Sequence, residues 1–267
     1  MQAIESWLAQ AEAHRRETGK PLVSLCYAQS LDGSITARRG EPTALSGQES
    51  SRLTHQLRAA HDAILVGVGT VLADNPRLTV RLAQGRQPQP VILDSHCRTS
   101  LDARLLREHP LPAWIATTQA APSERRLALE SARGRLLVLP AGSQGRVDLP
   151  ALLDCLAEMG VNSLMVEGGA NVITSFLSQH LADQVVLTIA PVFLGGLHTF
   201  DGARANSLDV AQDVISRTGV QANSLDVAQD VILRTAGQAN SLSYKGIRLN
   251  NVRYEILGED LIVFGQL

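Results

Sequence analysis

Residues 62–76, DAILVGVGTVLADNP, join an apolar run to a turn that contains two glycines. A short continuous apolar run that ends at a glycine is typical of a strand buried on both faces, as in a parallel sheet. The glycines suit either a phosphate-binding turn or a plain connection to the next element. Because Leu72 stands where the third glycine of G-x-G-x-x-G would be, the stretch is a poor match to a Rossmann phosphate loop.

The chain alternates between strand-like and helix-like segments up to about residue 192. Near-continuous apolar strands separated by helices indicate a largely parallel sheet with helices on both faces. The last stretch, residues 247–267, is interrupted by NN and GED, which is typical of an antiparallel hairpin. The sequence therefore predicts an α/β fold with a largely parallel mixed sheet and a C-terminal antiparallel hairpin. The predicted strands cover 21–28, 62–68, 90–94, 113–118, 135–140, 163–169 and 184–194, and the predicted helices cover 48–60, 122–132, 149–159 and 170–179.

The composition excludes several classes of protein. Of the 267 residues 45% are hydrophobic and 19% are charged, with a net charge of −2, so we expect no binding to nucleic acid or to an anionic membrane. Cys26, Cys97 and Cys155 are far apart, which disfavours a disulfide framework and a structural zinc site and favours the cytoplasm. No apolar run approaches the ~18 residues that a membrane helix needs.

The N-terminal stretch, residues 1–19, is too polar for a signal peptide. Its apolar residues Ile4, Trp7, Leu8 and Ala11 share one helical face. We therefore expect an N-terminal helix that packs on the surface of the domain.

One segment breaks the alternating pattern. Residues 205–221 are repeated at 222–238 with 14 of 17 positions identical. We interpret this segment, 205–238, as a tandem duplication in a surface loop of a single domain that spans 1–267. The alternative is that the extra helices cover the active site or extend a dimer contact.

The stretch 166–177, VEGGANVITSFL, places two glycines between a strand that ends at Glu167 and a helix that begins near Ala170. Backbone N–H groups at such a helix start suit a pyrophosphate. Glu167 is expected at the carboxyl end of its strand, where open α/β sheets bind ligands. The alternative is an ordinary Gly-Gly turn.

The helix predicted over residues 48–60 carries His55 and Arg58, three residues apart and therefore on one face. Arg58 is a candidate anion anchor, and the alternative is a solvated helix face. His55 and His61 do not make a metal site, because their spacing is six and no third ligand converges on them.

Five of these stretches together closely resemble the pyrimidine reductases of riboflavin biosynthesis. They are YAQSLDGSIT at 27–36, THQLRAAHDAILVGVGTVLADNPRLTVR at 54–81, VILDSHCR at 91–98, VEGGANVITSFL at 166–177 and DQVVLTIAPVFLGG at 183–196. The resemblance implies a dihydrofolate-reductase-like α/β fold, NADPH as the cofactor and a homodimer. It also implies reduction of the ribose of a pyrimidine ribosylamine 5′-phosphate to the open-chain ribityl form.

The resemblance also implies roles for particular residues. Asp32 and Glu167 are the carboxyl candidates for the proton donor, and water is equally open. Arg98, close to Ser95 in sequence, is a candidate partner for the 2′-phosphate of NADPH. The implied substrate-binding residues are Arg58, Leu78, Arg81 and Glu167. The implied NADPH-binding residues are Ala28, Thr70, Asp74, Ser95, Gly169, Ala170, Asn171, Val172, Ile173, Thr174 and Ser175.

Two positions depart from the family pattern. Ala44 stands where the bacterial branch has an aromatic residue, and Asn75 replaces the second acid of LADDP. YAQSLDG is closer to the fungal and archaeal branch, which reduces the 2,5-diamino pyrimidinone, whereas the bacterial enzyme reduces the deaminated uracil. Both substrates stay open. Two further alternatives are a non-catalytic accessory subunit of the same fold and a reductase of another small carbonyl or pterin-like substrate.

Overall fold

The computed structural model describes residues 2–38, 40–198 and 247–267. The duplicated segment 205–238 lies outside these residues, and so does the interpretation given to it. None of the helices in the described part of the chain is long and apolar enough to cross a membrane.

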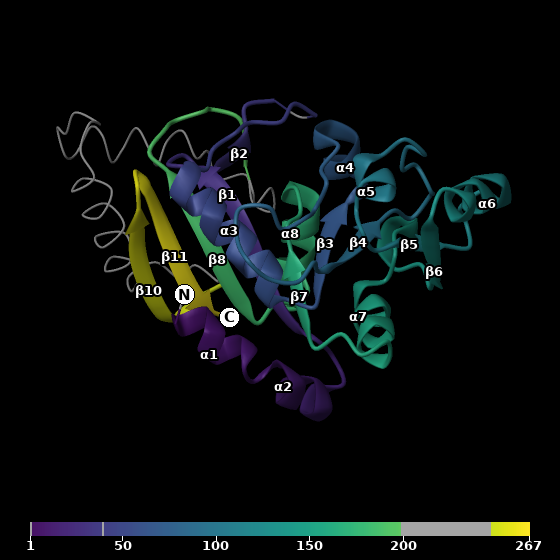
Figure 1. Ribbon diagram of the computed structural model, residues 1–267, viewed down its shortest axis with the longest axis horizontal. Helices are drawn as coiled ribbons and strands as arrows, with labels where there is room; N and C mark the ends of the chain where they lie inside the picture. Colours follow the sequence, from purple (N-terminus) through teal and green to yellow (C-terminus); the bar gives the residue numbers. More distant parts are fainter. Residues whose placement is uncertain (1, 39, 199–246) are drawn as a thin grey trace.

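The centre of the molecule is a nine-stranded mixed sheet (Figure 1) with the order β10-β11-β8-β1-β7-β3-β4-β5-β6. The strands from β8 to β6 in this order are parallel, and β11 pairs antiparallel with both β8 and β10. The predicted mixed sheet and its closing hairpin are confirmed. The strands are β1 (Leu22–Ser30), β3 (Ala63–Gly67), β4 (Gln89–Leu93), β5 (Ala113–Thr118), β6 (Gly134–Leu139), β7 (Ser163–Val166), β8 (Gln184–Ala190), β10 (Asn250–Leu257) and β11 (Asp260–Gln266).

Helices cover both faces of the sheet, as the near-continuous apolar strands require. One face packs against α7 and α8, and the other packs against α1, α3, α4, α5 and α6. The four helices predicted from the sequence are present to within one residue at each end. The helices are α1 (Gln2–Leu8), α2 (Ala11–Thr18), α3 (Gln48–Ala60), α4 (Val68–Asp74), α5 (Arg104–Arg107), α6 (Ser123–Ser131), α7 (Leu149–Glu158) and α8 (Ala170–Ser178), with a 3-10 turn at Ser143–Gly145.

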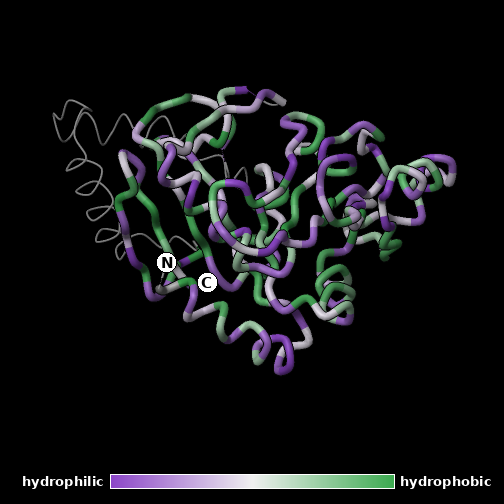
Figure 2. Tube along the Cα trace, in the orientation of Figure 1, coloured by the Kyte–Doolittle hydropathy of each residue, from purple (hydrophilic) through white to green (hydrophobic). Residues whose placement is uncertain are grey.

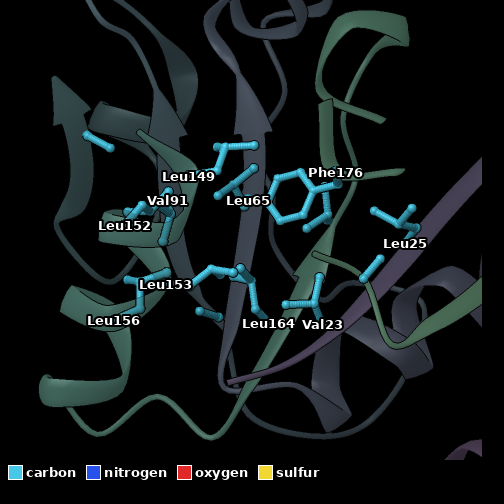
Figure 3. Close-up of a cluster of buried hydrophobic side chains, with 14 of the residues drawn as sticks. Val23, Leu25, Leu65, Val91, Leu149, Leu152, Leu153, Leu156, Leu164 and Phe176 are labelled. Atoms are coloured by element: carbon cyan, nitrogen blue, oxygen red, sulfur yellow. The ribbon is translucent and has the colours of Figure 1, made fainter. Parts of the chain in front are cut away.

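The largest core cluster lies between the sheet and the helices α7 and α8 (Figure 3). Phe176 of α8 and the leucines of α7 meet side chains from β1, β3, β4 and β7, and Phe176, Leu65 and Leu164 are completely buried. Hydropathy along the chain follows this arrangement, with hydrophobic residues concentrated in the central strands (Figure 2). Each large side chain buried in this way contributes about 1.5–3 kcal/mol.

The N-terminal segment forms two short helices in place of the single helix expected over residues 1–19. Helix α1 ends at Leu8, and α2 starts at Ala11 after a tight turn in which the amide of Gln10 donates to the carbonyl of Trp7. The expected apolar face still packs on the domain, because Ile4 and Ala11 are buried and Trp7 packs against the core cluster beneath α3.

A second, two-stranded sheet pairs β2 (Ser34–Thr36) with β9 (Leu197–His198). Neither strand was predicted, because two or three residues are too few to show an alternating pattern. This small sheet brings the segment after β1 against the segment after β8.

His61, at the junction of α3 and β3, is completely buried. Its Nδ1 donates to the carbonyl of Leu57 (2.7 Å) and its Nε2 lies 3.0 Å from the hydroxyl of Ser24, so the neutral ring is fully hydrogen-bonded. Burial lowers the pKa of His61 to about 4, against the opposing pull of the Leu57 carbonyl.

We therefore predict that the free energy of unfolding falls as the pH drops from about 6.5 towards 4, because the unfolded chain binds a proton there that the folded chain excludes. Between pH 7 and pH 5, His61 should account for a decrease of about 2 kcal/mol in the free energy of unfolding. Denaturant unfolding of H61Q at the two pH values should show a loss smaller by that amount. The exposed His180 provides the control H180Q, which should keep the wild-type dependence. An unchanged pH dependence in H61Q would contradict the assignment.

Candidate active site

A cleft of about 700 Å³ opens at the carboxyl end of the parallel strands. Ligand pockets are commonly about 300–1,000 Å³ in volume. Here β1, β7 and β3 end side by side, at the edge where open α/β sheets bind their ligands. Residues of α3, of α4, of the first turn of α8 and of the small β2–β9 sheet complete the lining.

Arg58 and Glu167 form an ion pair inside this cleft. Nε of Arg58 donates to Oε1 of Glu167 (2.7 Å) and Nη2 donates to Oε2 (2.6 Å), while Nη1 donates to the carbonyl of Thr79 (3.2 Å). The two side chains are only 13% and 16% exposed. Burial opposes the guanidinium charge, but the carboxylate of Glu167 outweighs it and raises the pKa of Arg58. The guanidinium of Arg58 therefore stays charged, with two further N–H groups left for other acceptors.

The glycine turn after Glu167 brings the start of α8 against the sheet. A Cβ on Gly168 would lie 2.5 Å from Cβ of Val172, and a Cβ on Gly67 would lie 2.8 Å from its Cγ2. Both positions therefore require glycine, because Val172 occupies the space beside them. Gly169 is the N-cap of α8 and no side chain caps the helix, so first-turn N–H groups are available to an anion.

The glycines of residues 62–76 thus have two different roles. Gly67 ends β3 and permits the close approach of α8, whereas Gly69 lies in the first turn of α4 and lines the cleft. A Cβ on Gly69 would meet nothing within 4 Å. This stretch is a strand-to-helix connection that borders the cleft, and it lacks the geometry of a Rossmann loop.

Most of the residues expected to bind the cofactor line the cleft. Asp74 is the charged one among them: burial raises the pKa of its carboxyl, and it has no hydrogen-bond partner within the described residues. Of the expected cofactor-binding residues, those that line the cleft are Ala28, Thr70, Asp74, Gly169, Ala170, Asn171 and Val172.

The other expected cofactor residues lie outside the lining. Ile173 is completely buried in the core. The hydroxyl of Ser175 donates to the carbonyl of Asn171 on its own helix. The hydroxyl of Ser95 accepts from the amide of Val147 (3.0 Å). Ser95 therefore connects the loop after β4 to the segment that precedes α7. Thr174, the remaining one, is also absent from the lining.

Of the residues expected to bind substrate, Arg58, Leu78 and Glu167 line the cleft and Arg81 does not. Nη1 of Arg81 donates to the hydroxyl of Thr79 (2.8 Å), directly beside the Arg58–Glu167 pair. Burial and the nearby positive charges, Arg58 first among them, lower the pKa of Arg81. An anion at this end of the cleft would relieve that repulsion.

The carboxylate of Asp32 has a structural role in the small β2–β9 sheet. Its carboxylate accepts hydrogen bonds from the hydroxyls of Ser30 (2.5 Å) and Ser34 (2.7 Å) and from the amides of Leu194 (2.9 Å) and Gly195 (2.8 Å). Partial burial opposes its ionisation, but these donors outweigh it and lower the pKa of Asp32 to about 2. It is therefore ionised at neutral pH and holds the β2–β9 sheet, so the geometry favours Glu167 as the carboxylate that faces a ligand.

The structure adds residues to the cleft that sequence reasoning did not select, notably Cys26 and Thr188. The sequence does not show that Thr188 faces the cleft, because the direction of its side chain depends on the pairing of β8 with β1, which places it opposite Ala28. Arg98, the candidate for a 2′-phosphate, lines the cleft and is exposed. No cluster of His, Cys, Asp and Glu suited to a metal ion occurs within 2–38, 40–198 and 247–267.

The fold and the cleft define an α/β protein with an open cleft at the carboxyl edge of a largely parallel sheet. More narrowly, the chain belongs to the RibD C-terminal domain family, whose sequence profile matches residues 21–221. The resemblance inferred from the motifs is thereby confirmed.

Individual relatives agree with this family. The chain is 40% identical over 199 residues to the 2,5-diamino-6-ribosylamino-4(3H)-pyrimidinone 5′-phosphate reductase of Methanothermobacter thermautotrophicus, covering 73% of this chain and 89% of that one. The riboflavin biosynthesis reductase Rib7 of Saccharomyces cerevisiae superposes with a TM-score of 0.64 at 25% identity, over 94% of this chain and 91% of that one. RibD of Acinetobacter baumannii, at 22% identity and a TM-score of 0.73, shares the fold over 97% of this chain, which spans 61% of that longer chain.

The packing of Val172 against the glycine turn gives a first test of the site. G168A should lower the free energy of unfolding by about 1–3 kcal/mol, because the new methyl group overlaps Val172. The double variant G168A/V172A should lose less than the sum of the single variants, since the smaller side chain removes the overlap. As a control, G69A adds a methyl group to open space on a helix and should not destabilise the protein. Strict additivity in the double variant would contradict this packing.

The carboxylate of Asp32 gives a second test. In D32A the amides of Leu194 and Gly195 lose their acceptor, so their hydrogen exchange should become faster by at least tenfold. The amide of Leu22, which donates to Asn162 at the other end of β1, should exchange as in the wild type. Unchanged exchange at Leu194 and Gly195 would show that the β2–β9 sheet is held by other contacts.

Proposed function

We propose that this protein is an NADPH-dependent reductase of riboflavin biosynthesis that reduces the ribose of a pyrimidine ribosylamine 5′-phosphate to its ribityl form. Membership of the family supports a reductase that uses a nicotinamide cofactor, because the relatives at 34–40% identity carry the names of this pathway's enzymes. The observation that carries the proposal is the Arg58–Glu167 pair at the cleft beside an uncapped helix start.

The cofactor would lie along α4 and the start of α8. Three polar side chains there, Thr70, Asp74 and Asn171, line the cleft and have no hydrogen-bond partner within the described residues, so they are available to the hydroxyl and phosphate oxygens of a dinucleotide. The first-turn N–H groups of α8 suit its pyrophosphate. Arg98, which likewise has no ion-pair partner there, supports the choice of NADPH over NADH through the 2′-phosphate.

The substrate would occupy the part of the cleft next to Arg58 and Glu167. Both oxygens of Glu167 accept from Arg58, which fixes the carboxylate and leaves lone pairs for N–H or O–H groups of the substrate. Arg81, and the two spare N–H groups of Arg58, lie where a dianionic phosphate would be stabilised.

The residues of this chain would act mainly by positioning. When bound, the nicotinamide supplies a hydride to C1′ of the ribose. The fixed Arg58–Glu167 pair would orient the substrate so that C1′ faces the cofactor side of the cleft. The opened sugar also takes up a proton; because Glu167 is the carboxylate partner of Arg58, it would orient a proton-donating water and would not give the proton itself. A homodimer, which the resemblance implies, and a cytoplasmic location, which the scattered cysteines favour, are part of this proposal.

The deciding experiment is NADPH oxidation by the purified protein, with the diamino pyrimidinone and the deaminated uracil ribosylamine phosphates supplied separately. Turnover of one of them establishes the reductase and the order of reduction and deamination. Binding of NADPH without turnover of either would direct the search to another carbonyl substrate. Absence of NADPH binding would favour the accessory subunit.

The choice of cofactor leads to a prediction for Arg98. R98A should raise KM for NADPH about tenfold, because a charge-assisted contact to the 2′-phosphate is lost, and should leave KM for NADH unchanged. Arg107, an exposed arginine paired with Asp102, provides the control R107A, which removes the same charge outside the cleft. Equal effects of R98A on both cofactors would rule out a role in recognising the 2′-phosphate.

A further inference from the structure

Thr188 is a buried residue whose hydroxyl faces the cleft. It lies on β8, in register with Ala28 of β1 and with Ile262 of β11, and its side chain is only 6% exposed. Its side chain lines the cleft, yet the hydroxyl has no hydrogen-bond partner within the described residues. The hydroxyl oxygen is not sealed from the cleft, so its hydrogen-bonding capacity is open to a ligand there.

Two other threonine hydroxyls of the cleft are already bonded within the chain. Thr54 donates to the carbonyl of Ser50 (3.1 Å), and Thr36 donates to the carbonyl of Arg38 (3.0 Å). Thr70 has no hydrogen-bond partner within the described residues either, but it lies on α4 on the cofactor side. Thr188 is therefore an available hydrogen-bonding group on the opposite, sheet side of the cleft.

The surroundings of Thr188 are apolar. Its register partner on β11, Ile262, belongs to a hydrophobic cluster. Four other members of this cluster line the cleft: Cys26, Leu53, Leu57 and Val186. Such side chains suit the faces of a flat ring and do not suit a phosphate. The arginines that suit a phosphate, Arg58 and Arg81, gather instead around Thr79.

We propose that Thr188 positions the substrate by a hydrogen bond between its hydroxyl and the polar edge of the pyrimidine ring. This inference rests on the proposed function and adds a residue to it. The ring lies against Leu53, Leu57 and Val186, while the phosphate lies towards the arginines. Since a hydroxyl can donate or accept, Thr188 serves either an amino or a carbonyl group of the ring.

The test compares two substitutions in the full-length protein. T188V keeps the shape and removes the hydroxyl, and T188S keeps the hydroxyl. T188V should lower kcat/KM for the pyrimidine substrate about tenfold, the loss expected for one hydrogen bond, while KM for NADPH is unchanged. T188S should recover most of the loss.

Thermal unfolding separates positioning from a structural role. Because the hydroxyl has no partner within the described residues, T188V should have a midpoint close to that of the wild type. A lower midpoint together with unchanged kcat/KM would overturn the proposal, because the hydroxyl would then serve the fold alone. Unchanged kcat/KM at any midpoint would also overturn it.

Competition with ribose 5-phosphate identifies the part of the substrate involved. Its inhibition constant should be the same for the wild type and T188V, since the hydroxyl contacts the ring. A raised inhibition constant in T188V would overturn the proposal in favour of a sugar contact. Failure of the wild type to reduce either pyrimidine would overturn the proposed function itself, whereas failure of the inference alone leaves the wild type active.

Discussion

The pairing of Arg58 with Glu167 is the constraint on which the arrangement of the cleft depends. It joins the last turn of α3 to the end of β7, and through the carbonyl of Thr79 it also holds the segment after α4. Removing charges from water is costly, and the attraction between them offsets that cost only with good geometry and further hydrogen bonds. The two-point contact, with both partners mostly buried, meets this condition. Loss of either partner would leave a buried charge without compensation, typically at a cost of about 3–5 kcal/mol.

Around this pair, the sheet concentrates functional groups by topology. Strand β7 lies between β1 and β3, so the ends of three chain segments far apart in sequence meet at one edge. The core clusters on the two faces hold these strands rigidly, while glycines at positions 67 and 168 let α8 come close enough to present its first turn. Rigid elements thus position a cleft whose lining mixes apolar side chains with a few polar groups, as small-molecule sites generally do.

Much of this fold could be predicted from the sequence, because its strands are buried and its helices amphipathic. The runs at β3, β5 and β8 and the boundaries of α3 follow directly from that periodicity. Long-range pairing could not be predicted. The burial of Arg58 against Glu167, the four donors to Asp32 and the inward direction of Thr188 all depend on residues distant in sequence. Periodicity indicates which face of an element is apolar, but it does not indicate what lies opposite.

The carboxylate of Asp32 connects positions 162 and 163 residues further along the chain, and the Arg58–Glu167 pair spans 109 residues. Contacts of such long range form slowly, because loop closure must precede the gain from the contact. Helices and adjacent strands of the first half can form early, but the cleft cannot exist until β7, α8 and the segment after β8 have been made and docked. A ribosome-bound chain that ends before residue 194 would therefore have most of a hydrophobic core and no complete binding site.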